Sequence, residues 1–255
     1  MNYDQTLSRV ETYFDKTALK TWERLTSTAP VSRIRQSVRE GRNQMRTKLI
    51  SQLPKDLSGA RVLDAGCGTG QLSEELALRG CQVVAADISP SLLNVARSRI
   101  PDHLHQNIEF VAGDMVSSEL GKFDYVIAMD SLIYYRRNDL RALLLELSSR
   151  VSESIYFTLA PKTMLLMLMW YIGKLAPKGD RSPVMVPHSL KSIEREFIGK
   201  LELSDLGIIN CGFYISHAIG CRKCKLGHLV FYQILRGGCC HLRMQRVQIF
   251  RLVNC

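Results

Sequence analysis

The stretch Val62-Leu63-Asp64-Ala65-Gly66-Cys67-Gly68-Thr69-Gly70 decides how this chain of 255 residues is expected to fold. An apolar run ends in an acid, and glycine then occupies every second position from Gly66 to Gly70. Glycine permits backbone conformations barred to other residues and lets a ligand approach the backbone closely. Because a helical pattern begins at Gln71, we predict a strand, a tight turn and a helix. The spacing differs from the Gly-x-Gly-x-x-Gly of dinucleotide-binding folds.

Three further predicted strands each end in an acid. Asp87 follows the strand 82–86, Asp114 follows 108–112, and Asp130 follows 123–129. In doubly wound folds, an acid about twenty residues after the first loop glycine hydrogen-bonds the ribose of a bound nucleotide. This spacing assigns the ribose to Asp87. Each acid could instead cap the helix that follows it.

With these strand ends, the glycine loop resembles motif I of the class I S-adenosylmethionine (SAM) methyltransferases. The resemblance implies SAM as co-substrate. In that family, the acid after the third strand pairs with the adenine amine, and the next apolar residue packs on the adenine ring. The cofactor-binding residues that the resemblance implies are Asp64, Gly66, Cys67, Gly68, Gly70, Asp87, Ile88, Asp114, Met115 and Met129.

The order of predicted elements indicates an α/β fold. Alternating strands and helices imply a parallel sheet that is covered on both faces. We therefore predict a Rossmann-like class I methyltransferase fold, with a mostly parallel seven-stranded sheet and N-terminal helices that cap the active site. The seventh strand is expected to enter antiparallel at the end of the sheet. The predicted strands are 61–65, 82–86, 108–112, 123–129, 154–159, 201–209 and 212–219, and the predicted later helices are 71–79, 90–99, 138–150, 163–176 and 189–198.

Composition and charge divide the chain into three parts. Residues 1–53 form the predicted capping helices, and residues 54–220 form the methyltransferase domain with a substrate-side insertion at 161–199. The chain is 46% hydrophobic and 23% charged, which suits one α/β unit with a large core. Residues 221–255 form an atypical tail that we do not expect to be part of the fold. From residue 222 onward this tail has no acid and seven basic residues, which supply most of the net charge of +10.

The tail also holds five of the eight cysteines, and several readings of it stay open. Cys221 and Cys224 have the spacing of a zinc site, with further ligands among Cys239, Cys240, His228 and His241. A second well-spaced Cys-x-x-Cys is absent, so we expect no protein-bound metal. The tail could also be a basic arm for nucleic acid or membrane, or an altered reading frame appended to a finished domain.

Segments outside the SAM motifs resemble the magnesium-protoporphyrin IX O-methyltransferases, above all those of purple bacteria that make bacteriochlorophyll. In the plant and cyanobacterial branch, Leu-Ile-His-Tyr stands where this chain has Leu132-Ile133-Tyr134-Tyr135. If that histidine acts as a base, its role passes to Tyr134 here or is unnecessary. The tail after about residue 220 matches nothing in the family. The matching segments are 10–15 with Trp22, 38–42, 129–135, 160–163, 181–188 and 212–216.

The resemblance implies transfer of the SAM methyl group to a propionate carboxylate of Mg-protoporphyrin IX, whose magnesium belongs to the substrate. A propionate has a pKa near that of Glu, about 4.3, so it is already a nucleophile at pH 7. The site must hold one oxygen in line with the sulfonium–methyl bond at about 3–3.5 Å. We predict Tyr13 and Tyr134 as catalytic residues that orient the carboxylate. Either could instead be an ordinary half-buried aromatic.

One face of the second N-terminal helix carries a stripe of arginines at positions 35, 39, 42 and 46. Such a stripe is usually a solvated surface. If the helix covers the pocket, one arginine can meet a carboxylate, and Arg39 is the predicted one because it lies in a segment that matches the family. Trp22, Met164 and His188 complete the predicted substrate contacts. The apolar stretch 164–172 is too short to span a bilayer and suits a buried helix, a porphyrin wall or a membrane contact.

Localisation and partners follow from the same features. The first residues lack the apolar region of a secretory signal, so we expect a cytoplasmic protein, peripheral to the photosynthetic membrane. The resemblance implies the porphyrin-binding subunit of magnesium chelatase as substrate donor. Two alternatives stay open: a methyltransferase of another small hydrophobic substrate, such as a quinone precursor, and a basic-tailed nucleic-acid-binding or RNA-modifying protein. We expect no nucleic-acid partner, because the chain before the tail is only weakly basic.

Overall fold

The computed structural model describes residues 3–162, 183 and 185–224. A first compact unit comprises the described residues up to Lys223. All the helices and strands named below belong to the first unit. The predicted apolar helix 163–176, with Met164, and the tail from residue 225 onward lie outside the described residues.

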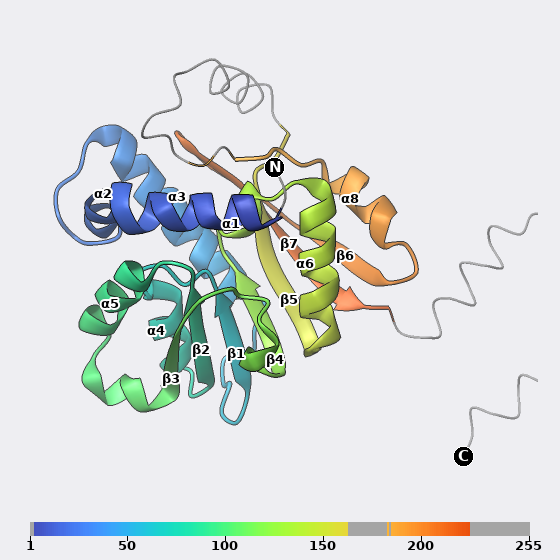
Figure 1. Cartoon of the computed structure of the whole chain (residues 1–255), viewed down its shortest axis with the longest axis horizontal. Coiled ribbons are helices and arrows are strands. Elements are labelled where there is room, and N and C mark those ends of the chain that lie inside the picture. The colour runs from blue at the N-terminus through green and yellow to red at the C-terminus, as the bar shows by residue number, and fades with distance from the viewer. Residues whose placement is uncertain (1–2, 163–182, 184, 225–255) are drawn as a thin grey trace, which may run out of the picture. The chain divides into compact units, whose positions relative to one another are not determined.

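Seven strands form one sheet in the order β3-β2-β1-β4-β5-β7-β6 (Figure 1). Strands β1 to β5 pair in parallel, and β7 runs antiparallel to both of its neighbours. The predicted fold class is confirmed by this topology. The strands are β1 (Arg61–Ala65), β2 (Gln82–Asp87), β3 (Ile108–Ala112), β4 (Phe123–Ala128), β5 (Val151–Leu159), β6 (Leu201–Cys211) and β7 (Tyr214–Lys223).

The expected place of the last strand was wrong. Strand β7 does not lie at the end of the sheet but between β5 and β6, and β6 forms the edge. Burial gives the reason. Most residues of β7 from Tyr214 to Cys221 are buried, whereas most residues of β6 are exposed or only partly buried. A strand buried on both faces needs neighbours on both sides, and an exposed strand tolerates the edge.

Helices cover both faces of the sheet, as predicted (Figure 1). On one face, Met45, Leu49, Leu72 and Leu76 from two helices join Val83 of β2 in one apolar core. On the other face, residues of α6 and α8 pack against alternate residues of the same strands. The helices of the first face are α3 (Arg33–Ile50), α4 (Gln71–Ala77) and α5 (Pro90–Arg99), and those of the second are α6 (Arg137–Ser149) and α8 (Leu190–Phe197).

The N-terminal cap, residues 3–25, consists of α1 (Tyr3–Thr12), a π-helical turn (Tyr13–Thr17) and α2 (Leu19–Leu25). Helix α1 lies across the edge of the sheet at which the parallel strands end (Figure 1). Val10, Phe14 and Ala18 of the cap share an apolar cluster with Leu92 of α5. Short 3-10 helices occur at Asp102–Asn107, Ser118–Leu120 and Leu132–Tyr134.

The sheet continues to Lys223, so the predicted boundary at residue 220 falls short of the fold. Cys221 pairs with both Ile155 and Leu203 and is buried, which places it in the sheet rather than in a tail. Among the described residues, no group of three His, Cys, Asp or Glu side chains could hold a metal ion. No helix in the described part of the chain is long and apolar enough to cross a bilayer.

We expect a chain that ends at Cys224 to unfold within about 2 °C of the full chain, because every strand pair of the sheet is retained. A chain that ends at Ile219 loses the pairs made by Gly220 and Cys221 and buries less of β5, so its thermal midpoint should fall by more than about 5 °C. Thermal unfolding of the three chains by circular dichroism measures both shifts. A large loss in the Cys224 chain would contradict the boundary.

Candidate active site

A pocket opens where β1, β2 and β4 end, at the point where the strand order reverses. Open α/β sheets bind their ligands at this position. Apolar side chains of the cap, Leu7, Val10, Phe14 and Trp22, form one wall. The glycine loop and the strand ends form the rest, with Arg42, Gly66, Cys67, Gly68, Ala86, Asp87, Ile88, Leu92, Gly113, Met115, Met129, Asp130, Ser131, Tyr134 and Tyr135.

The three loop glycines all have positive φ, but they serve different purposes. A Cβ on Gly66 would lie 2.5 Å from Cβ of Ser131, and one on Gly70 would lie 2.8 Å from Cβ of Ala96. These two positions need glycine for packing, and Gly70 does not line the pocket. A Cβ on Gly68 would have only the Trp22 indole nitrogen nearby, at 3.7 Å. Gly68 is therefore the glycine that leaves room for a ligand.

Asp87 lines the pocket with its carboxylate buried beneath the glycine loop. Its Oδ2 accepts a hydrogen bond from the backbone N–H of Gly68 at 2.8 Å, and its Oδ1 accepts one from that of Ser89 at 2.9 Å. Burial raises the pKa of Asp87, and the two backbone donors oppose that rise. The two hydrogen bonds fix the positions of both carboxylate oxygens. Each oxygen uses one lone pair for its backbone donor and can accept a further hydrogen bond from a hydroxyl group.

Asp64 lies deeper, in a recess that adjoins the pocket and is also lined by Arg42, Arg46, Thr69 and Gln71. The carboxyl group is almost fully buried, and the Ser73 hydroxyl donates to its Oδ2 at 2.6 Å. Burial raises the pKa of Asp64 to about 7, although the bond from Ser73 opposes this shift. The prediction that Asp64 belongs to the site is consistent with this place under the loop.

The raised pKa of Asp64 makes folding sensitive to pH. Between about pH 4 and pH 7 the folded protein binds a proton that the unfolded chain has released, so stability should fall as the pH rises through that range. We expect Asp64→Asn to remove this part of the fall. Thermal midpoints at pH 5.5 and pH 8 measure it, with the exposed Asp56→Asn as control. Identical pH profiles in wild type and Asp64→Asn would contradict the assignment.

Asp114 does not line the pocket, although its neighbours Gly113 and Met115 do. The Tyr3 hydroxyl lies 2.7 and 2.8 Å from its two oxygens, and the backbone N–H of Val116 donates to Oδ1 at 3.0 Å. The predicted contact with an adenine amine therefore has to share the carboxylate with Tyr3. Sequence reasoning missed Tyr3, because nothing in the motifs places the first helix beside the third strand.

Of the two predicted catalytic tyrosines, the structure places Tyr134 in the pocket wall. Burial, with the charge of nearby Asp130, raises the pKa of Tyr134, so its phenol stays protonated at neutral pH and can donate a hydrogen bond. Tyr13 lies in the same aromatic cluster, with its ring 5.1 Å from that of Phe14, but it does not line the pocket.

Arg39 does not reach the pocket, contrary to the prediction. Its guanidinium donates to the backbone carbonyls of Leu25 at 2.9 Å, Arg24 at 3.0 Å and Ala29 at 2.8 Å. The last carbonyls of a helix lack intrahelical donors, and Arg39 supplies them at the end of α2. The arginine that lines both the pocket and the recess is Arg42, one turn further along α3.

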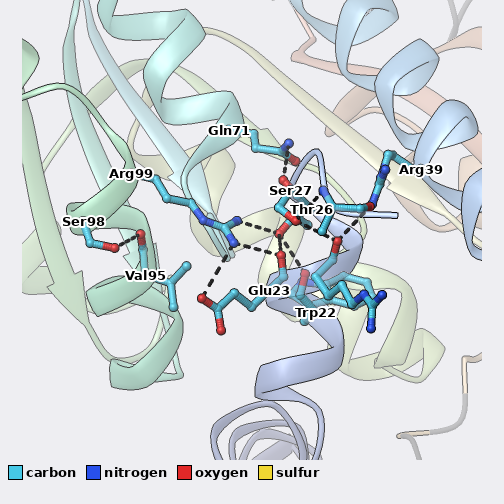
Figure 2. A network of polar contacts seen from close by, with 11 residues as sticks. Trp22, Glu23, Thr26, Ser27, Arg39, Gln71, Val95, Ser98 and Arg99 are labelled. Atoms are coloured by element: carbon cyan, nitrogen blue, oxygen red, sulfur yellow. Dashed lines mark hydrogen bonds and ion pairs between the residues drawn. The ribbon is translucent and has the colours of Figure 1, made fainter. Parts of the chain in front are cut away.

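Two more side chains hold the end of α2 from the opposite side (Figure 2). Arg99 of α5 donates to the Thr26 hydroxyl at 2.9 Å and to the carbonyl of Glu23 at 2.8 Å. Gln71 of α4 donates to the carbonyl of Thr26 at 2.9 Å. The cap is therefore fastened to the helices of the sheet by hydrogen bonds at its C-terminal end.

The remaining predicted substrate-binding residues differ in whether they line the pocket. Trp22 lines the pocket, and its ring contacts Phe14 edge-on, with the ring centres 5.5 Å apart. His188 is buried away from the pocket, where its Nε2 lies 3.0 Å from the carbonyl of Tyr135 and its backbone N–H donates to Ala160. Its ring thus ties the segment before α8 to the turn that precedes α6. Met164 lies outside the described residues.

Asp130 is the acid whose importance the sequence did not indicate. It lines the pocket with a φ of 57°, a left-handed conformation that is rare for residues other than glycine. Its carboxylate forms an ion pair with Arg42 at 2.5 Å. An acid at a strand tip is the only signal in the sequence, and the same signal suits a helix cap.

The strand order, the glycine loop after β1 and the acid at the end of β2 define a class I SAM-dependent methyltransferase. Residues 62–153 match a model of the methyltransferase domain, and residues 128–223 match one described as magnesium-protoporphyrin IX methyltransferase C-terminus. The magnesium-protoporphyrin O-methyltransferase of Rhodobacter capsulatus is 50% identical over 219 residues, which cover 86% of this chain and 97% of the relative. This chain belongs to the magnesium-protoporphyrin IX methyltransferase family.

Two further relatives agree. The chloroplastic magnesium protoporphyrin IX methyltransferase of Arabidopsis thaliana is 31% identical over 216 residues, 82% of this chain and 69% of the relative. The crystal structure of magnesium protoporphyrin IX methyltransferase from Synechocystis with bound SAH superposes with a TM-score of 0.74 at 27% identity. The superposition covers 85% of this chain and 99% of the Synechocystis chain.

Proposed function

We propose that this chain transfers the methyl group of SAM to a propionate carboxylate of Mg-protoporphyrin IX, which gives the monomethyl ester in bacteriochlorophyll biosynthesis. The observation that carries this function is the pocket between the strand ends and the cap, in a chain whose residues 62–223 match the family models. One wall is polar and suits a nucleoside, and the opposite wall is apolar and aromatic.

The polar wall is assigned to SAM. Asp87 binds the two ribose hydroxyls with the two oxygens that Gly68 and Ser89 hold in place. Ile88 and Met115 pack on the adenine, since both line the pocket beside Asp87. Gly68 lets the backbone approach the cofactor closely. The sulfonium then lies toward Met129 and Tyr134, at the end of β4.

The apolar wall excludes water from the reacting groups. A propionate is an anion at neutral pH, and it attracts the sulfonium more strongly once both are desolvated. Leu7, Val10, Phe14 and Trp22 of the cap supply that dry surface. The Tyr134 phenol donates a hydrogen bond to the carboxylate and turns one oxygen toward the methyl group, without becoming a competing nucleophile.

The pocket argues against the main alternative acceptor, a phenol such as a quinone precursor. Methylation of a phenol needs a base to remove its proton. No histidine is among the described residues that line the pocket, and the raised pKa of Tyr134 makes it a donor rather than a base. A carboxylate acceptor needs no base at all.

The chemistry of the substrate indicates a protein donor and a membrane contact. Mg-protoporphyrin IX is flat and apolar apart from its propionates, so it needs a carrier or a membrane surface in water. We propose the porphyrin-binding subunit of magnesium chelatase as the donor and a peripheral contact with the photosynthetic membrane. Transfer of Mg-protoporphyrin between purified proteins, with and without vesicles, tests both.

The direct test of the function is incubation of the purified chain with SAM and Mg-protoporphyrin IX. Mass spectrometry should detect a monomethyl ester that forms only with both compounds present. Gly68→Val serves as the inactive control, because the added side chain occupies the space left for the cofactor. Methylation of a quinol precursor but not of the porphyrin would overturn the assignment.

Asp87→Ala should weaken binding of S-adenosylhomocysteine (SAH) by about 1–3 kcal/mol, because the ribose loses a carboxylate that accepts its hydrogen bonds. Titration calorimetry measures the change. Asp102→Ala is the matched control, since the Asp102 side chain is fully exposed and does not line the pocket. Equal affinity in wild type and Asp87→Ala would contradict the assignment of Asp87 to the ribose.

Tyr134→Phe should lower turnover about 10- to 100-fold and leave SAH affinity unchanged, because the lost hydrogen bond orients only the substrate carboxylate. Turnover of wild type should stay level between pH 8 and pH 9, above the pKa of Asp64, since the pKa of Tyr134 is raised above its ordinary value and a propionate is fully ionised. Single-turnover rates measure both. Full activity in Tyr134→Phe with loss in Tyr13→Phe would assign the orienting role to Tyr13.

A further inference from the structure

Arg42 presents unused hydrogen-bond donors to the cofactor side of the pocket. A guanidinium carries five N–H groups. Within the described part of the chain, Arg42 uses one of them in its hydrogen bond to Oδ2 of Asp130, and its face lies 4.9 Å from the centre of the Trp22 ring. The side chain is only 16% exposed and lines both the pocket and the adjoining recess. Its remaining N–H groups suit an anion.

Asp130 is held too tightly to serve as a ligand itself. The Tyr214 hydroxyl lies 3.0 and 3.1 Å from its two oxygens, and the Ser216 hydroxyl donates to Oδ1 at 3.3 Å. Thr158 accepts the backbone N–H of Asp130 at 2.7 Å and donates to its Oδ1 at 3.1 Å. With Arg42, the donors come from α3, β5 and β7. They hold Asp130 in its left-handed conformation and occupy its carboxylate.

The position of Tyr214 is fixed in turn by α3. A Cβ on Gly41 would lie 2.4 Å from Cδ1 of Tyr214, so the ring packs directly on the backbone of the helix that carries Arg42. The helix, the last strand and Asp130 therefore meet in one rigid contact. A guanidinium held by such a contact loses little entropy when it binds a carboxylate.

The other arginine of the recess, Arg46, has fewer N–H groups left to bind a ligand. Arg46 forms an ion pair with Glu75 and donates to Oδ1 of Asn43 at 3.1 Å. The pocket that Asp87 lines and the recess share Gly66, Cys67 and Arg42 in their walls, so the two spaces adjoin. A ligand whose ribose lies at Asp87 can extend its other end to Arg42.

We propose that Asp130 is a positioning residue, which holds Arg42 so that the free N–H groups of its guanidinium bind the carboxylate at the methionyl end of SAM. Because this role rests on the proposed function, SAM is taken as the ligand. Strand β7 thereby becomes a support of the cofactor site through Tyr214 and Ser216. Arginine is suited to this task because its planar group can make two parallel hydrogen bonds to one carboxylate.

The test compares SAH with 5′-methylthioadenosine, which has the same nucleoside but no amino-acid end. Arg42→Met should weaken SAH about 10- to 100-fold, the cost of a lost charged hydrogen bond. Affinity for methylthioadenosine should stay within about twofold. Asp130→Asn should show the same split at about tenfold, because a loosened guanidinium binds less well. Arg35→Met, on the exposed part of the same arginine stripe, should change neither affinity.

Tyr214→Phe keeps the ring that packs on Gly41 and removes only the hydroxyl, so it tests the network without a large change in packing. It should weaken SAH more than methylthioadenosine, at a thermal midpoint close to that of wild type. Equal losses of both ligands in Asp130→Asn and Tyr214→Phe would show a general structural role and overturn the proposal. Unchanged SAH affinity in Arg42→Met would also overturn it. Failure of wild type to bind either ligand would instead contradict the proposed function.

Discussion

Parallel strands that end at one edge of a sheet bring their terminal side chains together, and in this protein those side chains are acids. Asp64 precedes the last residue of β1, Asp87 ends β2, and β3 and β4 are followed by Asp114 and Asp130. A buried carboxylate is costly unless hydrogen-bond donors surround it. The structure satisfies each one differently: with the Ser73 hydroxyl, with backbone N–H groups, with the Tyr3 phenol, and with Arg42, Tyr214 and their neighbours.

The need for donors explains why the N-terminal cap is part of the site. Tyr3 reaches Asp114, and Asp15 accepts from the Ser89 hydroxyl at 3.0 Å and from the backbone N–H of Ser91 at 3.1 Å. Ser89 in turn donates to Asp87, so the π-helical turn of the cap is linked to the proposed ribose ligand. The apolar wall over the pocket is thus held by Tyr3 on Asp114 and, through Ser89, by Asp15 beside Asp87, and these two strand-end acids are the ones proposed to bind the cofactor.

Much of the fold, and the place of the glycine loop and Asp87 at the pocket, could be predicted from the sequence, because local rules determine them. The glycine loop requires positive φ at three positions, and an acid at the end of β2 has a fixed place relative to that loop. Both were placed to within a residue or two. The antiparallel last strand was predicted, but its place inside the sheet depends on burial on both faces, which spacing does not reveal.

The rest of the site depends on contacts between distant parts of the chain. Arg39 and Arg42 lie on one helix face and in one family-like segment, so the sequence could not tell which one meets the pocket. The difference is that the end of α2 needs donors where Arg39 lies. Tyr3 and Asp114 are 111 residues apart, and Tyr214 and Asp130 are 84 apart, so no local pattern links either pair.

The central claim is that the strand-end acids and the cap together form a SAM site, and a crystal structure with SAH tests it most directly. The account predicts both ribose hydroxyls within about 2.6–3.0 Å of the two oxygens of Asp87, with the adenine between Ile88 and Met115 under the cap. SAH bound with its ribose away from Asp87, or with the cap displaced from the strand ends, would contradict it.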